Sequence, residues 1–226
     1  MKNIFSEELK KLFSDFTDMG TAVSGQIAQA TQSYIDHDKA AAQSLVTHDQ
    51  SINGNEVDLE KQALTLMTLQ QPVADDFRAV VSILKASADL ERIGDHATSI
   101  ASETIRVKGS HRNQSVEVKI ASLSQQIRDM LTTALTAFNA NDATQAEKIA
   151  KQDQSVDDQF DEIRNTVTVA MQQDPEVAAA GASYLLVTKL LERIGDRIVN
   201  LAEELVYNQT GEIIELNQSR IRPDGD

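Results

Sequence analysis

Apolar residues recur at a helical spacing over most of the chain. Two stretches step by three or four residues through six apolar positions each, which places those side chains on one face of an α-helix. Nowhere do apolar and polar residues alternate cleanly, as they do in a half-buried strand. The pattern therefore predicts an all-α protein. The two stripes are Ile120, Leu123, Ile127, Leu131, Ala134 and Phe138, and Val187, Leu190, Ile194, Ile198, Leu201 and Leu205.

Few residues can interrupt these helices, because the chain has only three prolines and nine glycines. Pro72 is expected at the first helical position after a break, with Asp75 and Asp76 in the first turn. The last helix is expected to run to about residue 208, with a loose end after it. We therefore predict six long helices. The predicted breaks lie at residues 36–38, 71–72, 109–110, 139–142 and 174–175.

The two halves of the chain resemble each other. The pentapeptide Glu-Arg-Ile-Gly-Asp occurs at 91–95 and again at 192–196, and we refer to these as the repeated pentapeptides. Two further markers, around residues 49 and 71, recur in the same order at a nearly constant offset. Such self-similarity indicates duplication. We predict two tandem, similar three-helix bundles. The predicted units are 1–110 and 111–208, followed by a C-terminal tail, 209–226.

Composition narrows the class of protein. The 226 residues include 21 Lys and Arg against 35 Asp and Glu, a net charge of −14. This charge disfavours binding to nucleic acid or to an anionic membrane surface. There is no cysteine, which excludes disulfides and thiolate metal sites. No apolar run approaches the length of a membrane span, so we expect a cytoplasmic protein with no membrane insertion.

Each repeated pentapeptide carries two carboxylates at positions i and i+4. On a helical wheel, Glu192 and Asp196 lie roughly 160 to 200° from the core residue Ile194. Glu91 and Asp95 take the equivalent positions in the first unit. We therefore expect two acidic rows that face outward, away from the core. An acidic row opposite an apolar stripe is also what an ordinary solvated surface looks like.

The middle helix of each unit adds more oxygen ligands. Asp153 and Asp157 lie one turn apart, and Asp49 and Asn53 are their counterparts. Like charges at this spacing repel each other, and a bridging cation would relieve the repulsion. All-oxygen ligation suits hard or borderline ions. The metal ions considered are iron, manganese, magnesium, zinc and calcium, and the spacing does not choose among them.

Residues 90–96 and 191–197 resemble the hallmark of the PhoU family of phosphate-transport regulators. Residues 71–78, Gln-Pro-Val-Ala-Asp-Asp-Phe-Arg, resemble a second family stretch. The resemblance covers essentially residues 4–215. It implies two similar three-helix bundles and a cytoplasmic accessory protein rather than a catalyst, which restrains phosphate uptake and signalling when phosphate is plentiful. The implied partners are the nucleotide-binding subunit of the phosphate ABC importer and the phosphate-sensing histidine kinase.

The resemblance also implies site residues. Some family members bind metal clusters on their acidic motifs, and a neutral Asn53 would weaken the site of the first unit. Asp76, Arg78, Arg92 and Arg193 are candidates for docking a partner. The alternatives are a helix-dipole role for Asp76, an exposed Arg78, and carboxylate pairing by the other two arginines. The implied metal ligands are Asp49, Glu91, Asp95, Asp153, Asp157, Glu192 and Asp196.

Two other functions stay open at this stage. A helical scaffold without metal would carry the same stripes. A carboxylate-bridged metal enzyme would need Glu-x-x-His motifs on inward faces, and no Glu here is followed by His three residues later. His96 follows the first repeated pentapeptide and is expected to be solvated. The sequence leaves homodimer formation open.

Overall fold

The computed structural model describes residues 2–48, 50–107 and 112–217. In that part of the chain every regular element is helical and no strand is present. This confirms the predicted all-α class. The elements are α1 (Lys2–Asp36), α2 (Lys39–His48), α3 (Gln50–Gln70), α4 (Asp75–Arg106), α5 (Gln114–Ala140), the 3₁₀ turn η1 (Ala143–Gln145), α6 (Ala146–Gln173), the 3₁₀ turn η2 (Pro175–Val177) and α7 (Ala178–Thr210).

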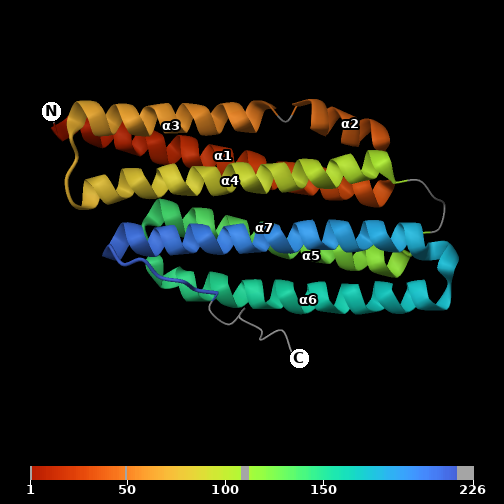
Figure 1. Cartoon of the computed structure of the whole chain (residues 1–226). Helices are drawn as coiled ribbons and strands as arrows, with labels where there is room; N and C mark the ends of the chain where they lie inside the picture. The colour runs from red at the N-terminus through yellow and green to blue at the C-terminus, as the bar shows by residue number, and fades with distance from the viewer. Residues whose placement is uncertain (1, 49, 108–111, 218–226) are drawn as a thin grey trace.

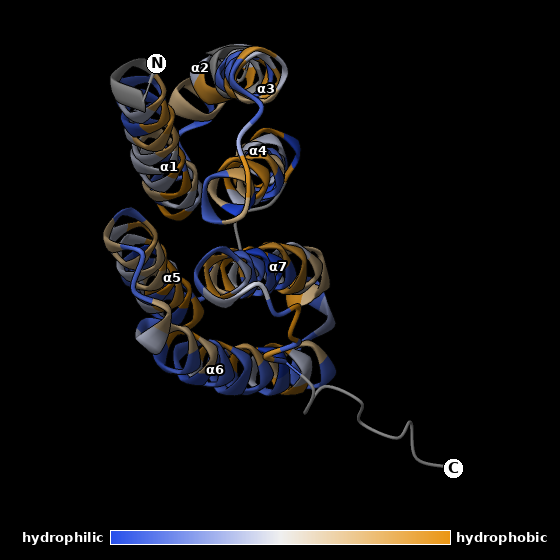
Figure 2. Cartoon of the chain, turned by 90° about the vertical axis from the view of Figure 1, so that its left-hand side faces the viewer, coloured by the Kyte–Doolittle hydropathy of each residue, from blue (hydrophilic) through white to orange (hydrophobic). Residues whose placement is uncertain are grey.

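The helices form two bundles that lie against each other (Figure 1). The end-on view in Figure 2 shows α1, α3 and α4 as one triangle and α5, α6 and α7 as a second. The triangles meet along two helix pairs, α1 with α5 and α4 with α7. The tandem arrangement predicted from the internal repeat is therefore confirmed, and the third helix of each unit lies at the centre of the molecule.

The middle helix of the first unit differs from the expectation of six helices. It is divided into α2 and α3, and residue 49 between them lies outside the described part of the chain. The sequence pattern predicted Pro72 at the first helical position, but α4 begins only at Asp75. The backbone φ of Ala74 is 51°, a positive value that is incompatible with a right-handed α-helix. Asp75 and Asp76 do lie in the first turn, as predicted.

The remaining breaks have visible chemical causes. Asn113 caps α5 by accepting a hydrogen bond from the backbone N–H of Val116. Asn141 ends α5 in the left-handed conformation. Asp174 accepts from the backbone N–H of Glu176 and so fixes the turn that contains Pro175. The breaks at 36–38, 139–142 and 174–175 are confirmed; the one at 109–110 lies outside the described residues, and α4 ends before it, at Arg106.

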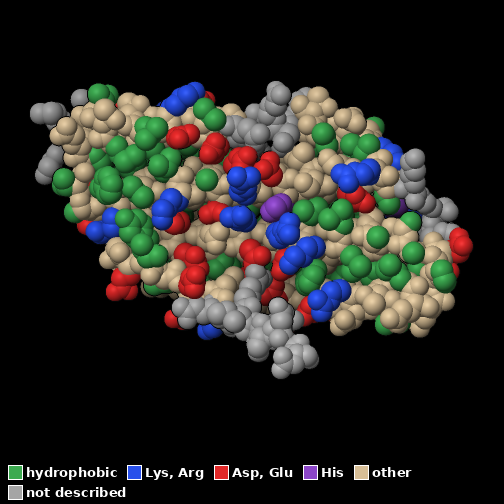
Figure 3. Space-filling model, viewed as in Figure 1, with side chains coloured by type: hydrophobic (Ala, Val, Ile, Leu, Met, Phe, Trp, Pro, Cys, Tyr) green, Lys and Arg blue, Asp and Glu red, His purple; other side chains and the backbone are tan. Residues whose placement is uncertain are grey.

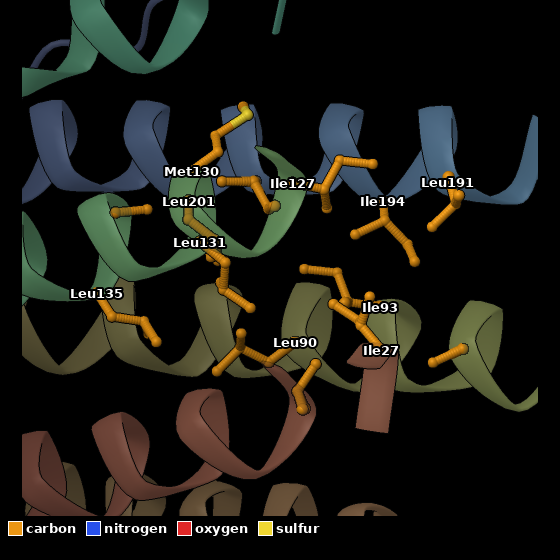
Figure 4. Close-up of a cluster of buried hydrophobic side chains, with 14 of the residues drawn as sticks. Ile27, Leu90, Ile93, Ile127, Met130, Leu131, Leu135, Leu191, Ile194 and Leu201 are labelled. Atoms are coloured by element: carbon orange, nitrogen blue, oxygen red, sulfur yellow. The ribbon is translucent and has the colours of Figure 1, made fainter. Parts of the chain in front are cut away.

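The two bundles share one hydrophobic core. All twelve residues of the two predicted stripes are buried. Figure 4 shows Ile27, Leu90 and Ile93 of the first unit facing Ile127 and Ile194 of the second. These residues belong to a single contact cluster that spans both units. Burial of apolar area between the units, and not only within them, therefore fixes how they sit together.

Close helix approach supports this joint core. The Cα of Gly20 on α1 lies directly under the side chain of Leu135 on α5, where any Cβ would overlap the Leu135 methyl groups. Glycine is the residue that allows such an approach.

The segment after α7 is docked rather than loose as far as it is described. Gly211 ends the helix with a φ of 80°, and residues 211–217 then run back over α7. The backbone N–H of Leu216 donates to Glu203 at 2.8 Å, and the Asn217 amide donates to Asp153 at 3.0 Å. Leu216 also packs on the core. Within the described ranges, no helix is both long and apolar enough to cross a membrane.

Candidate functional site

The repeated pentapeptides lie on the two helices at the centre of the molecule. α4 and α7 run antiparallel, side by side (Figure 1). Two ion pairs tie them together: Lys85 to Glu204 at 2.9 Å and Asp89 to Arg197 at 3.0 Å. Continuing this register along the helices places the two repeated pentapeptides opposite each other. The duplication thus brings both copies of the motif to one place.

The expectation that both acidic rows face outward is wrong for the second unit. Only 7% of Glu192 is exposed, and Asp196 is half-buried. The reason is that α6 packs against α7 at the second pentapeptide, where Asp153 lies against Gly195. A helical wheel identifies the face opposite the core stripe, but it does not show which helix packs against that face. In the first unit Glu91 and Asp95 are both half-buried, so they reach the surface only partly.

The acidic face of the second unit is built around Asp153 of α6. This side chain is 1% exposed and lies against Gly195 of α7, where a Cβ would be 2.6 Å from Oδ1. Its Oδ2 accepts the hydrogen bond from Asn217. Beside it, Glu192 Oε2 lies 2.7 Å from Lys189 Nζ. A buried carboxylate needs such partners to stay charged.

The predicted metal ligands that lie in the described part of the chain do not form a closed site. Among the described residues, no three His, Asp or Glu side chains come close enough together to hold a metal ion. Asp49 and the side chain of Asn53 lie outside that description. The remaining acids are Glu91 and Asp95 on α4, Asp153 and the half-buried Asp157 on α6, and Glu192 and Asp196 on α7. The donor types suit a hard ion, whereas the described geometry does not, so metal binding stays a prediction.

The arginines of the repeated pentapeptides differ in their partners. Arg92 lies 3.7 Å from both Glu91 and Asp95, within the range of an ion pair but too far for a hydrogen bond. Arg193 is exposed and makes no hydrogen bond or ion pair with any described residue. Carboxylate pairing is thus seen for Arg92 and not for Arg193.

Basic side chains gather on the face where α4 and α7 lie side by side. Figure 3 shows Lys, Arg and His side chains along the middle of this face, with acidic side chains above and below them. His96 is half-buried here, contrary to the expectation of a solvated histidine. Its pKa is lowered by burial first, then by the positive charges of Arg193 and Arg197. Asp95 opposes the shift and Arg92 adds to it.

Arg78, a candidate for partner docking, is bound within the chain. Its guanidinium donates to Asp75 at 2.6 Å and to the backbone carbonyl of Asn208 at 3.3 Å. It therefore ties the start of α4 to the end of α7. Asp76 is exposed, and both residues line a hollow of about 660 Å³ between the two units.

Sequence analysis did not predict a cluster of buried polar side chains at the end of the molecule opposite Arg78. Glu117 of α5 is 4% exposed and accepts hydrogen bonds from Arg112 at 2.8 Å and from the Tyr184 hydroxyl at 2.8 Å, with His37 at 3.4 Å. Burial alone would raise the pKa of Glu117, but the hydrogen bonds outweigh it and lower the pKa. One signal was present: Glu117 lies three residues before Ile120, on the apolar stripe.

Comparison with known proteins decides the family. The model of the PhoU domain matches the chain twice, over residues 16–104 and 120–205. The chain belongs to the PhoU family. A PhoU relative from Clostridium acetobutylicum, named a phosphate-specific transport system accessory protein PhoU homolog, is 30% identical over 217 residues, which are 96% of this chain and 99% of the relative. A relative of the same name from Streptococcus pneumoniae is 31% identical, and the match covers 96% of this chain and 100% of the relative.

Solved PhoU structures share the fold. The crystal structure of the phosphate transport system regulatory protein PhoU from Streptococcus pneumoniae superposes with a TM-score of 0.86 at 29% identity, and the match covers 93% of this chain and 99% of that one. PhoU from Pseudomonas aeruginosa superposes with a TM-score of 0.84 at 31% identity, over 92% and 100% of the two chains. The relatives are named as accessory or regulatory proteins and not as enzymes.

Proposed function

We propose that this chain is a cytoplasmic regulator that restrains phosphate uptake and phosphate-responsive two-component signalling. The observation that carries the proposal is the double match to the PhoU domain, together with full-length relatives named as accessory proteins of phosphate transport. The proposed partners are the nucleotide-binding subunit of the phosphate importer and the phosphate-sensing histidine kinase. The protein acts by binding them, without a catalytic step of its own.

Exposed residues beside the α3–α4 turn give this proposal a surface. Val73 is 76% exposed and Phe77 is 43% exposed, next to the exposed carboxylate of Asp76. Apolar side chains in the open beside a charge are typical of a contact surface between proteins. We propose Asp76 as a docking residue, and Arg92 and Arg193 as further ones on the α4–α7 face. Arg78 acts indirectly, by holding the turn in place.

Deleting the gene tests the regulatory role. Without the protein, phosphate uptake and a phosphate-starvation reporter should both stay high in phosphate-rich medium, and the intact gene should restore repression. Unchanged uptake and unchanged reporter activity would overturn the proposal. Asp76→Ala should weaken repression while the fold is kept, whereas Asp58→Ala, a change on the 72% exposed side chain of α3, serves as the matched control and should have no effect.

Metal binding on the acidic faces is a separate proposal. Closing a site in the second unit would require the acids near Asp153 to move closer together and Lys189 to leave Glu192. Metal analysis of protein purified without chelator tests this directly. Bound metal that is lost in the Glu192→Gln, Asp196→Asn double variant would support it. Protein that carries no metal and gains no thermal stability with Mn²⁺, Fe³⁺ or Mg²⁺ would exclude it.

A further inference from the structure

The hollow of about 660 Å³ between the two units lies at the end of the molecule where α4 begins, on the left in Figure 1. It is lined by the first half of α1, the first turn of α4 and the ends of α5 and α7. Hydrogen bonds across it hold these elements together. Arg78 donates to Asp75 and to the carbonyl of Asn208, and the Asn208 amide donates to Asn141 at 3.1 Å. The hollow is therefore built by both units and fixed by the contact between them.

The hollow has an apolar floor and an acidic rim. Leu9 and Phe13 of α1 form the floor, because both line the hollow and pack on the hydrophobic core. Asp18 and Asp76 form the rim, because both line it and are exposed. Neither rim carboxylate makes a hydrogen bond or an ion pair with any residue that the structure describes. An apolar floor beside carboxylates suits the side chain of Lys or Arg, which combines an apolar stem with a cationic head.

The charge of the lining also favours a cation. The lining residues include the carboxylates of Asp18, Asp75 and Asp76 and the cations of Lys10 and Arg78. Arg78 is already paired with Asp75. One cation then remains against the two carboxylates of the rim, on a chain with a net charge of −14. A cationic side chain from another molecule is therefore attracted to the hollow, whereas an acidic one is repelled.

Exposed apolar side chains lie at the same end of the molecule. Leu69 is 72% exposed, Val73 is 76% exposed and Phe77 is 43% exposed. They belong to the end of α3, the turn after it and the start of α4, and Phe77 directly follows the rim residue Asp76. Figure 3 shows hydrophobic side chains gathered over these helix ends, on the left of the molecule. Apolar area in the open beside an acidic hollow is typical of a surface that a partner covers.

We propose that the hollow, together with Val73 and Phe77, binds a protein segment in which a Lys or Arg side chain lies beside apolar side chains. The cationic side chain enters the hollow, lays its stem on the floor and pairs its head with the carboxylates of the rim. The apolar side chains of the segment cover Val73 and Phe77. This inference rests on the proposed function, because the segment is expected on the nucleotide-binding subunit of the phosphate importer.

The affinity of the chain for this purified subunit, measured at high phosphate, tests the surface. The Val73→Ala, Asp76→Asn double variant removes apolar area and one charge of the rim, and it should bind more weakly by about tenfold or more. The affinity of the unaltered chain should fall as salt is added, and the affinity of Asp76→Asn should fall less. Thermal unfolding should stay unchanged in the variants, since both residues are exposed.

The Val57→Ala, Asp58→Asn double variant is the matched control. It makes the same two changes of side chain on α3, beginning about 18 Å along the helix from Leu69. Val57 is 41% exposed, and the side chain of Asp58 is 72% exposed. This variant should bind the subunit as tightly as the unaltered chain does.

The outcomes separate this inference from the proposed function. Weaker binding by the Val73→Ala, Asp76→Asn variant alone supports both. If the unaltered chain binds the subunit and this variant binds equally well, or the control variant loses as much affinity, the surface is wrong and the proposed partner stands. An affinity that salt does not change overturns the pairing in the hollow. If the unaltered chain does not bind the subunit, the proposed partner is wrong, and the surface proposed for it is wrong as well.

Discussion

The carboxylate of Asp153 lies on the Cα of Gly195. A Cβ at position 195 would come within 2.6 Å of Oδ1 and within 3.3 Å of a Val156 methyl group. Asp153 is on the second helix of its unit and Gly195 is inside the second repeated pentapeptide. The glycine of this pentapeptide therefore has a physical role, which is to make room for a buried carboxylate from the neighbouring helix.

Gly195→Ala should lower the free energy of unfolding by about 1 to 2 kcal/mol. Overpacking against Asp153 costs roughly 1 to 3 kcal/mol, and the better helix propensity of alanine returns up to about 1 kcal/mol. Urea denaturation measures the difference.

Asp153→Ala supplies the control for this prediction. With the carboxylate removed, the added methyl group should be tolerated, and Gly195→Ala should become neutral or slightly stabilising in that background. An equal loss of stability in both backgrounds would show that the two residues are not coupled.

Glu117→Gln should destabilise the protein in a pH-dependent way. The folded protein holds the pKa of Glu117 below its ordinary value of 4.5, so the unfolded chain binds more protons at acidic pH. The stability gained from the ionised carboxylate is thus complete above the ordinary pKa and is lost as the pH falls through the lowered one. We expect the free energy of unfolding of the variant to be about 2 kcal/mol lower than that of the unaltered protein at pH 7. This difference should become smaller below about pH 4.

Unfolding by urea at several pH values checks this, with Glu162→Gln as the control. The Glu162 side chain is 63% exposed in its ion pair with Lys119, so its substitution should cost little at any pH. If Glu117→Gln lowers the free energy of unfolding by the same amount from pH 7 to pH 3, the explanation given for this cluster is wrong.

Asn217→Ala should loosen the segment that covers the acidic face of the second unit. The variant loses the 3.0 Å hydrogen bond to the buried Asp153, and a hydrogen bond to a charged group contributes about 1.5 to 3 kcal/mol. Hydrogen exchange at the amide of Leu216, which donates to Glu203, should become faster.

Ile213→Ala tests whether this effect is specific. Ile213 lies in the same segment and is 85% exposed, so its truncation should leave both stability and exchange at Leu216 nearly unchanged. Equal effects of the two substitutions would mean that Asn217 does not anchor the segment.

The helices and the duplication could be predicted from local pattern. A stripe at helical spacing is decided by residues within a few turns of one another, which is why all twelve predicted stripe residues are buried. The same holds for the turn at Asp174 and Pro175, where cap and proline are adjacent. The prediction that Pro72 is the first helical residue failed because a positive φ at Ala74 delays the start of α4. Hydrophobic spacing and the position of a proline do not predict a positive φ at an alanine.

The candidate site could be predicted only in part, because its environment depends on contacts between units. The wheel placed Glu192 opposite the core stripe, but Glu192 is buried where α6 packs against α7. Spacing alone also could not show that Arg197 would meet Asp89 of the other unit, or that Asn217 would reach Asp153. The equivalence of His96 and Arg197 was visible in the repeat, yet it gains meaning only when α4 and α7 lie together.

Direct binding to the importer tests the central claim. A quantitative binding assay should measure the affinity of the tagged chain for the purified nucleotide-binding subunit of the phosphate importer at high and at low phosphate. The sensor kinase should be assayed in the same way as a second partner. The account predicts saturable binding that is stronger at high phosphate. The absence of binding to both partners at either phosphate level would contradict it.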